Sequence, residues 1–252
     1  MSTSRYLALG ALAAASLSAH AAIELGDANL SYQQSFDSLA ASGTSSVLPA
    51  GWAFLETGTN ANTTYAAGTG SGTAGNVYSF GSDGSSERAL GGLLSGSLTP
   101  VFGASFTNQA SRAIDSLAIS YTGEQWRLGA TGRADRLQFQ YSTDASSLST
   151  GNWISVSALD FGSLVNSGPT GALNGNVNSA SVSGSLSGLS LAQGATVWLR
   201  WTDFNASGSD DGLAVDNFSL NATLAPVPEP SSYALLLAGL GAIGLVARRR
   251  RS

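Results

Sequence analysis

Short runs of alternating apolar and polar residues constrain most strongly how residues 22–226 can fold. Between Asp135 and Ser142, the apolar residues Leu137, Phe139 and Tyr141 occupy every second position, and polar residues separate them. A period of two places all three side chains on one face of an extended chain, which is typical of a β-strand with one buried face. No stretch of useful length in this region shows the 3.6-residue period of a helix.

The same pattern recurs along the chain and predicts an all-β fold. Glycine accounts for 31 of the 252 residues, and Gly, Ser and Asn interrupt the apolar runs as turn residues do. Many short strands separated by such turns favour a jelly-roll, lectin-like β-sandwich. Two low-complexity segments, 68–76 and 166–185, are expected to be loops or edge hairpins. The further predicted strands are 52–55, 77–80, 104–107, 117–121, 153–156, 177–186, 196–202 and 213–220.

The first residues of the chain have the form of a secretory signal. Arg5 provides a positive charge, and an apolar run rich in Ala and Leu follows it. Small residues at Ala19 and Ala21 form a cleavage signal, with Ala22 as the expected first residue of the mature protein. Residues 1–21 are therefore predicted to be a signal helix that is removed; the alternative is an uncleaved membrane anchor.

The last residues of the chain form a tail in three parts. The apolar part has 15 residues, at the lower edge of what spans a membrane, and the positive-inside rule keeps the arginines cytoplasmic. Residues 227–252 are thus predicted to contain a hydrophobic helix that holds residues 22–226 outside the inner membrane. The three parts are Val227, Pro228, Glu229 and Pro230, then the uncharged run 233–247, then Arg248, Arg249, Arg250 and Arg251.

This tail resembles the PEP-CTERM sorting signal of Gram-negative bacteria, in which a Pro-Glu-Pro motif, a short hydrophobic helix and an arginine cluster follow one another. The resemblance covers residues 227–252 only. It implies transit to the cell envelope, processing by an exosortase-type enzyme, and association with exopolysaccharide or biofilm systems. A plain C-terminal anchor is the alternative.

Several segments between residues 30 and 222 together resemble a β-sandwich module of bacterial secreted proteins. That module occurs alone with sorting tails, and also beside lamin-tail-like and extracellular nuclease domains. The resemblance implies a lectin-like jelly roll with no known catalytic residue, and the nuclease part is not in this sequence. The segments are SERALG at 86–91, YTGEQWR at 121–127, ADRL at 134–137, WLRWTD at 198–203 and DGLAVD at 211–216.

The composition excludes most catalytic chemistry. The chain contains no Cys and no Lys, and its one histidine, His20, leaves with the signal. Serine triads, cysteine nucleophiles, Schiff bases and ordinary zinc sites are thereby excluded. The acidic body also argues against a nucleic-acid partner. What remains is an acid–base pair drawn from Glu56, Glu87 and Glu124, as in glycoside hydrolysis; the alternative is that these carboxylates are structural.

The region from 203 to 216 is the best candidate for a metal site. Oxygen-bearing side chains and Gly208 imitate the start of an EF-hand loop, but the bidentate Glu of that loop is missing. Calcium bound in a loop between strands is one interpretation, and a turn capped by Asp and Asn side chains is the other. The candidate ligands are Asp203, Asn205, Ser207, Asp210, Asp211 and Asp216.

Asp216 is unusual because a regular strand would bury it beside Phe218. A buried carboxylate without a partner is costly, so a bulge, backbone donors, a metal or an arginine such as Arg200 or Arg127 is required. We therefore expect Asp216→Ala to destabilise the protein more than any other Asp→Ala change. Trp126, like the other four tryptophans, is expected to pack in a core rather than stack on sugars.

These observations predict an exported, envelope-sorted, non-catalytic surface or matrix protein. It would bind extracellular polysaccharide or act as an adhesin in a biofilm, and its tail would contact the inner membrane transiently. A carboxylate-based, glycan-active surface enzyme is the alternative, and a calcium-dependent coat component is a third hypothesis.

Overall fold

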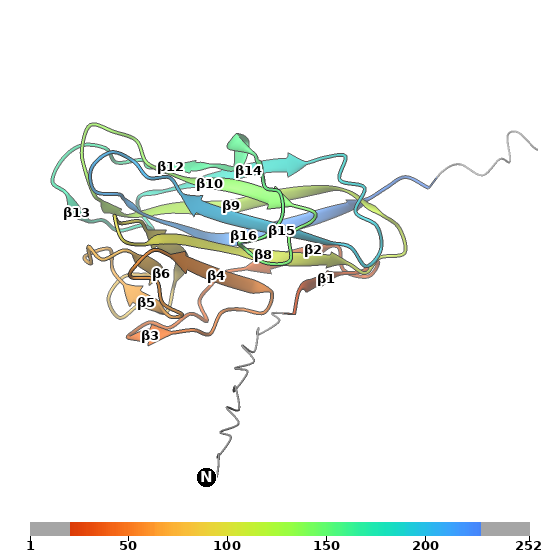
Figure 1. Cartoon of the computed structure of the whole chain (residues 1–252), viewed down its shortest axis with the longest axis horizontal. Coiled ribbons are helices and arrows are strands. Elements are labelled where there is room, and N and C mark those ends of the chain that lie inside the picture. Colours follow the sequence, from red (N-terminus) through yellow and green to blue (C-terminus); the bar gives the residue numbers. More distant parts are fainter. Residues whose placement is uncertain (1–20, 228–252) are drawn as a thin grey trace, which may run out of the picture.

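The computed structural model describes residues 21–227, and these residues fold into two packed β-sheets (Figure 1). The all-β sandwich predicted from the sequence is confirmed. The predicted signal helix, the sorting motif from Pro228 onward and the C-terminal hydrophobic helix lie outside the described residues. Within 21–227, no helix is long and apolar enough to cross a membrane.

The first sheet has seven strands and is built around three long antiparallel neighbours, β8, β15 and β10. Shorter strands pair with β8 on one side and with β10 on the other. Its strands are β1 (Ile23–Leu25), β4 (Trp52–Thr57), β8 (Thr99–Asn108), β10 (Arg136–Ser142), β11 (Ile154–Ser155), β12 (Phe161–Gly162) and β15 (Thr196–Asp203).

The second sheet has nine strands, and the long antiparallel pair of β9 and β16 runs through its middle. A 3-10 turn, η1 (Ser157–Leu159), packs beside β14. The strands are β2 (Ser31–Gln34), β3 (Thr44–Ser45), β5 (Tyr65–Gly68), β6 (Asn76–Phe80), β7 (Ala89–Leu93), β9 (Ile114–Leu128), β13 (Gly171–Ala172), β14 (Ser179–Leu186) and β16 (Gly212–Leu224).

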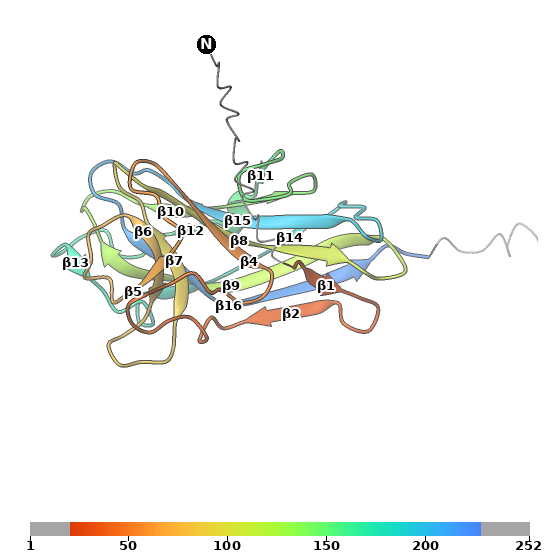
Figure 2. The ribbon, with the colours of Figure 1, turned by 60° about the horizontal axis from the view of Figure 1, so that its bottom comes forward.

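The alternating residues of both sheets form one core between the layers. Figure 2 shows β15 and β8 in one layer and β16 and β2 in the other. Trp201 of β15 stacks against Trp52 of β4 with ring centroids 5.9 Å apart, and it meets Phe218 of β16 edge-on at 5.8 Å. Aromatic contacts of this kind join the two sheets.

Each predicted strand overlaps an observed one. The short strands β1, β2, β3, β5 and β12 were not predicted, and neither was β7. Its sequence, ALGGL, shows no alternation because all five residues are buried. Leu90 packs in the main core, whereas Ala89 and Leu93 pack on the opposite face with Phe80 and Trp126. A strand that is covered on both faces loses the period-two pattern.

Candidate metal centre

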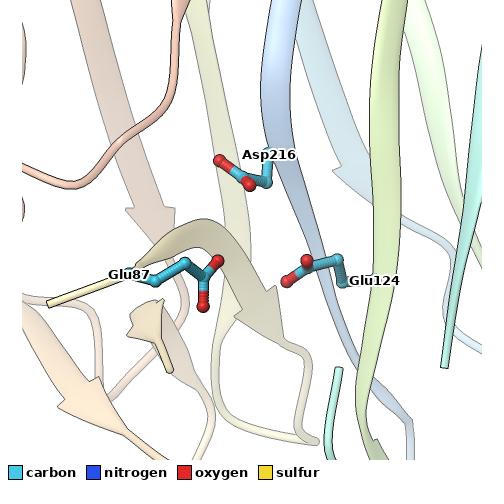
Figure 3. A group of neighbouring side chains, drawn as sticks. All are labelled: Glu87, Glu124 and Asp216. Atoms are coloured by element: carbon cyan, nitrogen blue, oxygen red, sulfur yellow. The ribbon is translucent and has the colours of Figure 1, made fainter. Parts of the chain in front are cut away.

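Three carboxylates from neighbouring strands meet on the outer face of the nine-stranded sheet. Glu124 lies on β9, Asp216 on β16, and Glu87 comes two residues before β7. These strands are adjacent in the order β9–β16–β7. One oxygen of each carboxylate lies within 4.8 Å of an oxygen of each of the other two, and Figure 3 shows the side chains pointing toward one another.

A β-bulge turns Asp216 away from the main core. Val215 packs in that core, so the alternation of a strand places Asp216 on the opposite face. The register with β9 then shifts between Asp216 and Ser219, and Asn217 has a φ of 48°, which Asn tolerates better than most residues. Phe218 consequently returns to the core. Of the alternatives that the sequence left open, the structure contains the bulge.

The bulge also marks the place where β16 changes its neighbour. On the side away from β9, residues 213–215 of β16 pair with β7, and residues 218–221 pair with β2. Asp216 and Asn217 fall between these two ladders. The three carboxylates therefore gather at a break in the sheet, where β7 ends as a partner and β2 begins.

Neutral groups donate one hydrogen bond to each of the three carboxylates. None of the ion pairs found among residues 21–227 includes Glu87, Glu124 or Asp216. The negative charges consequently have no arginine partner within that range. The donors are Trp126 Nε1 to Glu124 Oε2 at 2.8 Å, Asn217 Nδ2 to Asp216 Oδ2 at 2.7 Å, and Asn176 Nδ2 to Glu87 Oε2 at 2.6 Å.

The other oxygen of Asp216, Oδ1, is buried and has no hydrogen-bond partner. The Asp216 and Glu124 residues are each only 3% exposed, so water provides little solvation for their charges. Burial of a charged group without a partner is unfavourable by several kcal/mol. The fold thus keeps at this position an acceptor that nothing in the described chain satisfies.

The electrostatics of the cluster favour a bound positive charge. Burial raises the pKa of Glu124 to about 7, against the lowering effect of the Trp126 hydrogen bond. Burial likewise raises the pKa of Asp216 to about 7, against the lowering effect of the backbone N–H of Asn217, and the negative charges of Glu124 and Glu87 raise it further. Either protons or a cation can relieve this repulsion.

The arrangement fits a hard, oxygen-seeking cation. Calcium takes carboxylate and carbonyl oxygens as ligands, typically about six to eight of them in flexible geometry. The free Oδ1 of Asp216 and the neighbouring oxygens of Glu87 and Glu124 can supply part of that shell. The arrangement does not suit Glu87 and Glu124 as a glycosidase pair, because Glu124 is buried and leaves no surface for a sugar ring.

Four other aspartates form a second acidic cluster, around Arg133. Arg133 lies 3.3 Å from Asp135 and 3.4 Å from Asp211. Asp135 and Asp211 also accept backbone hydrogen bonds, from Asp211 N and Gly129 N respectively. Their carboxylates are therefore satisfied by an arginine and by the main chain, with Asp203 and Asp210 close by.

The predicted calcium loop from 203 to 212 mostly uses its carboxylates to hold the chain. Asp210 accepts from Ala206 N at 2.8 Å, and Asp203 accepts from Leu94 N at 3.0 Å. Asn205 and Ser207 are exposed. These contacts are those of the capped turn, the second interpretation of the sequence. The structure assembles Asp203, Asp210 and Asp211 in this turn, and it separates Asp216 from them.

The two arginines considered as partners of Asp216 lie elsewhere, so an arginine is not the alternative that the structure adopts. Arg200 donates to Gln140 at 2.8 Å and stacks on Trp153 at 3.8 Å, on the outer face of the other sheet. Arg127 donates to Gly70 O at 3.0 Å. Arg200 belongs to the seven-stranded sheet, so it lies in the other layer from Asp216.

The tryptophans and the remaining glutamate are mainly structural. Trp52, Trp126 and Trp201 are almost fully buried, as core packing predicts. Glu56 accepts from Val77 N at 2.7 Å and from Asn62 N at 3.0 Å. Glu56 therefore ties two segments together and takes no part in the cluster of three carboxylates.

Sequence reasoning named all three members of the cluster but did not join them. The sequence suggests Glu87 and Glu124 for acid–base chemistry. It suggests Asp216 for metal binding, together with the loop from 203 to 212. The available signal was the Asp216-Asn217 pair inside an otherwise apolar strand, because Asn accommodates the backbone of a bulge. The pairing of β7 with β16, which brings Glu87 close, has no signal in the sequence.

A family model matches the end of the chain. Residues 226–251 match the PEP-CTERM protein-sorting motif. The chain is therefore an exported protein that is sorted through its C-terminal tail. No curated protein matches the chain.

Several solved structures are similar to the sandwich. The K3 cleaved adhesin domain of Lys-gingipain from Porphyromonas gingivalis is 11% identical with a TM-score of 0.42, over 69% of this chain and 93% of that one. The CBM22-1-CBM22-2 tandem domain of Paenibacillus barcinonensis Xyn10C is 12% identical with a TM-score of 0.38, over 79% of this chain and 46% of that one. TmCBM61, in a complex with beta-1,4-galactotriose, is 10% identical with a TM-score of 0.34, over 68% of this chain and 88% of that one. The chain spans 19%, 23% and 28% of three longer matched chains.

Proposed function

We propose that this exported chain is a calcium-binding, non-catalytic surface or matrix protein, in which Glu87, Glu124 and Asp216 hold the ion. The observation that carries the proposal is the buried Oδ1 of Asp216, which has no hydrogen-bond partner and lies among two further carboxylates. A bound cation would satisfy this oxygen and remove the repulsion between the three charges.

The ion would act as a structural link between strands. Glu124, Asp216 and Glu87 belong to β9, β16 and the approach to β7, so one ion would tie three segments together across the break in the sheet. The Trp126 and Asn217 hydrogen bonds would orient Glu124 and Asp216 toward it. No step of chemistry is required of the ion.

Thermal melts with and without calcium test this proposal. Free calcium at about 100 times its Kd should stabilise the folded state by about 2.7 kcal/mol, which corresponds to roughly 5–10 °C for a domain of this size. Asp216→Asn should abolish the shift, whereas Asp83→Asn, which changes an exposed aspartate, should retain it. A melting temperature of the parent protein that does not change when calcium is added would refute the metal site.

Sorting would proceed in the order implied by the motif. The tail would hold the chain at the inner membrane of a Gram-negative cell until an exosortase-type enzyme cleaves near Pro228. The Pro-Glu-Pro motif, apolar run and arginines support this order. The intact mass of the exported protein is the measurement: loss of Arg248–Arg251 is expected, and a species that retains Arg251 would contradict processing.

The released sandwich would associate with extracellular polysaccharide in the matrix. The absence of His, Cys and Lys from residues 22–226 supports a binding role rather than catalysis. A pull-down on envelope polysaccharide, with calcium or with EDTA, should retain the protein without releasing reducing ends. Failure to bind any polysaccharide would leave a purely structural coat component, and the calcium melt would still report on the ion.

One observation favours a second candidate function, a carboxylate-based glycan-active enzyme. Glu124 and Asp216 have pKa values of about 7 and lie within 4.8 Å of each other, as an acid and a base can. Their burial argues against it. Release of reducing ends that Glu124→Gln abolishes would establish the enzyme.

A further inference from the structure

The edge strand β14 is long and regular, and besides β9 only the short 3-10 turn η1 packs beside it among the described residues. It pairs with β9 over all eight residues, without a register shift. The other strands that have a single pairing partner have six residues or fewer. Figure 1 shows β14 along the upper margin of the sandwich. A long flat edge of this kind offers its free main-chain groups to another strand.

The main-chain groups of the serines in β14 face away from β9. Gln125 N donates to Asn178 O at 2.9 Å, just before the strand. Along an antiparallel strand, alternate residues direct their N–H and C=O groups to opposite sides. The main-chain groups of Ala180 and Val182 therefore bond to β9, and those of Ser181 and Ser183 point away from it. Among residues 21–227, no hydrogen bond joins the main chain of Ser181 or Ser183 to another segment.

Nothing in β14 guards this edge. Natural edge strands carry charged side chains, proline or a bulge that block pairing with other chains. The sequence of β14, SASVSGSL, contains none of these. From Phe161 to Leu199 the chain has no ionisable side chain at all, although residues 22–226 contain 15 acidic and 6 basic residues. The strand itself therefore presents no like charge to a second copy of this acidic protein.

The strand is also complementary to itself. A twofold axis through Val182 sets Ser181 opposite Ser183 of a second copy, and Ala180 opposite Gly184. Outer-face serines then meet serines, and the small inner-face residues meet one another without crowding. The free groups of Ser181 and Ser183 form the hydrogen-bonded pairs of the new ladder, as the outward direction of their main-chain groups requires.

We propose that β14 is a self-association edge, at which a second copy of this chain pairs antiparallel about Val182 and joins two nine-stranded sheets into one. The inference is independent of the metal centre and of polysaccharide binding. It makes the sandwich a dimer built through main-chain hydrogen bonds, a form suited to a protein gathered at high local concentration by its sorting tail.

Disulfide cross-linking of the full chain tests the register, because the chain has no cysteine of its own. Ser181→Cys chains mixed with Ser183→Cys chains should give a linked dimer under mild oxidation. Each variant alone should give little, because Ser181 does not face Ser181 of the partner. No cross-link in the mixture, or an equal yield from either variant alone, would overturn this pairing.

A charge placed on the edge tests the association itself. The full chain in detergent should sediment as a dimer, and Ser183→Lys should shift it to a monomer. Ser120→Lys is the matched control, since Ser120 is exposed on the same face and pairs with Ser183, but lies on the interior strand β9. A parent protein that is monomeric at all concentrations, or a Ser183→Lys dimer as stable as the parent dimer, would refute the proposal.

Discussion

The protein has two clusters of buried carboxylates, and they are satisfied in different ways. Around Arg133, Asp135 and Asp211 are bound by a guanidinium and by main-chain N–H groups. At the break in the nine-stranded sheet, Glu124 and Asp216 receive only neutral donors, and one oxygen of Asp216 receives none.

The difference shows that acidity alone does not define a metal site. The Arg133 cluster has more aspartates, and the sequence made it the stronger candidate for calcium. There Asp135, Asp210 and Asp211 accept hydrogen bonds from the protein. Asp203 Oδ1 has no partner, but burial raises the pKa of Asp203 well above its usual range, so this carboxyl retains its proton. The cluster of Glu87, Glu124 and Asp216 has fewer carboxylates and retains unused acceptor capacity. Its three carboxylates also bring oxygens within 4.8 Å of one another. An unsatisfied oxygen among converging carboxylates, not the number of acids, points to a cation.

The largest effect is expected at Asp211. Asp211→Ala removes the acceptor for Gly129 N and leaves Arg133 buried with one partner fewer, which should cost about 3–5 kcal/mol. This replaces the expectation that Asp216→Ala is the most destabilising Asp→Ala change. Melts of the Asp→Ala series measure it, with the exposed Asp83 as control; a smaller loss for Asp211 than for Asp216 would reverse the comparison.

Glu124→Gln should raise the melting temperature, rather than lower it, when calcium is absent. In EDTA at pH 8 the variant loses one of three mutually repelling charges, so it should melt above the parent protein. In calcium it should lack the stabilisation of about 2.7 kcal/mol expected of the parent. Destabilisation of the variant in EDTA would show that the cluster is satisfied without an ion.

Trp126→Phe should reduce the affinity for the ion while it keeps the aromatic packing on the outer face of the sheet. A phenyl ring can keep the stack on Phe80, whose ring centroid lies 6.0 Å from that of Trp126, but it cannot donate to Glu124. Loss of such an orienting partner typically reduces metal affinity by about 10–100-fold. Calcium titration measures the change, and an unchanged Kd would remove Trp126 from the site.

Asp203→Asn should produce the smallest change at acidic pH, and the difference from the parent should grow as the pH rises. Burial raises the pKa of Asp203 well above its usual range, so the folded protein holds its proton where the unfolded chain has lost it. Stability from this group is complete below the ordinary carboxyl pKa and falls as the pH rises toward the folded value. The variant should match the parent within about 0.5 kcal/mol near pH 3, below the ordinary carboxyl pKa, and exceed it at pH 8; a constant difference would contradict the shift.

The sequence predicted the sandwich because alternation survives wherever one face of a strand is buried. It located β10 and β15 to within one residue at each end, and it missed β7, where both faces are covered. The sorting tail could be predicted because its three parts follow one another directly along the chain. These successes depend on neighbours along the chain and not on the packing between strands.

The candidate site could be predicted only in parts. The conflict at Asp216 was visible, since a carboxylate shared the phase of Phe218, and a bulge was one of its foreseen solutions. Its arrangement with Glu87 and Glu124 depends on three strands that are distant in sequence. Single-sequence periodicity contains no information on which strands become neighbours, so the meeting of the three carboxylates required the structure.

The most direct test of the central claim is calorimetric titration of calcium into the parent protein, Asp216→Asn and Asp211→Asn. We predict one ion per chain for the parent, no binding for Asp216→Asn, and binding close to that of the parent for folded Asp211→Asn. Binding retained by Asp216→Asn but lost by folded Asp211→Asn would place the ion in the Arg133 cluster and contradict the account.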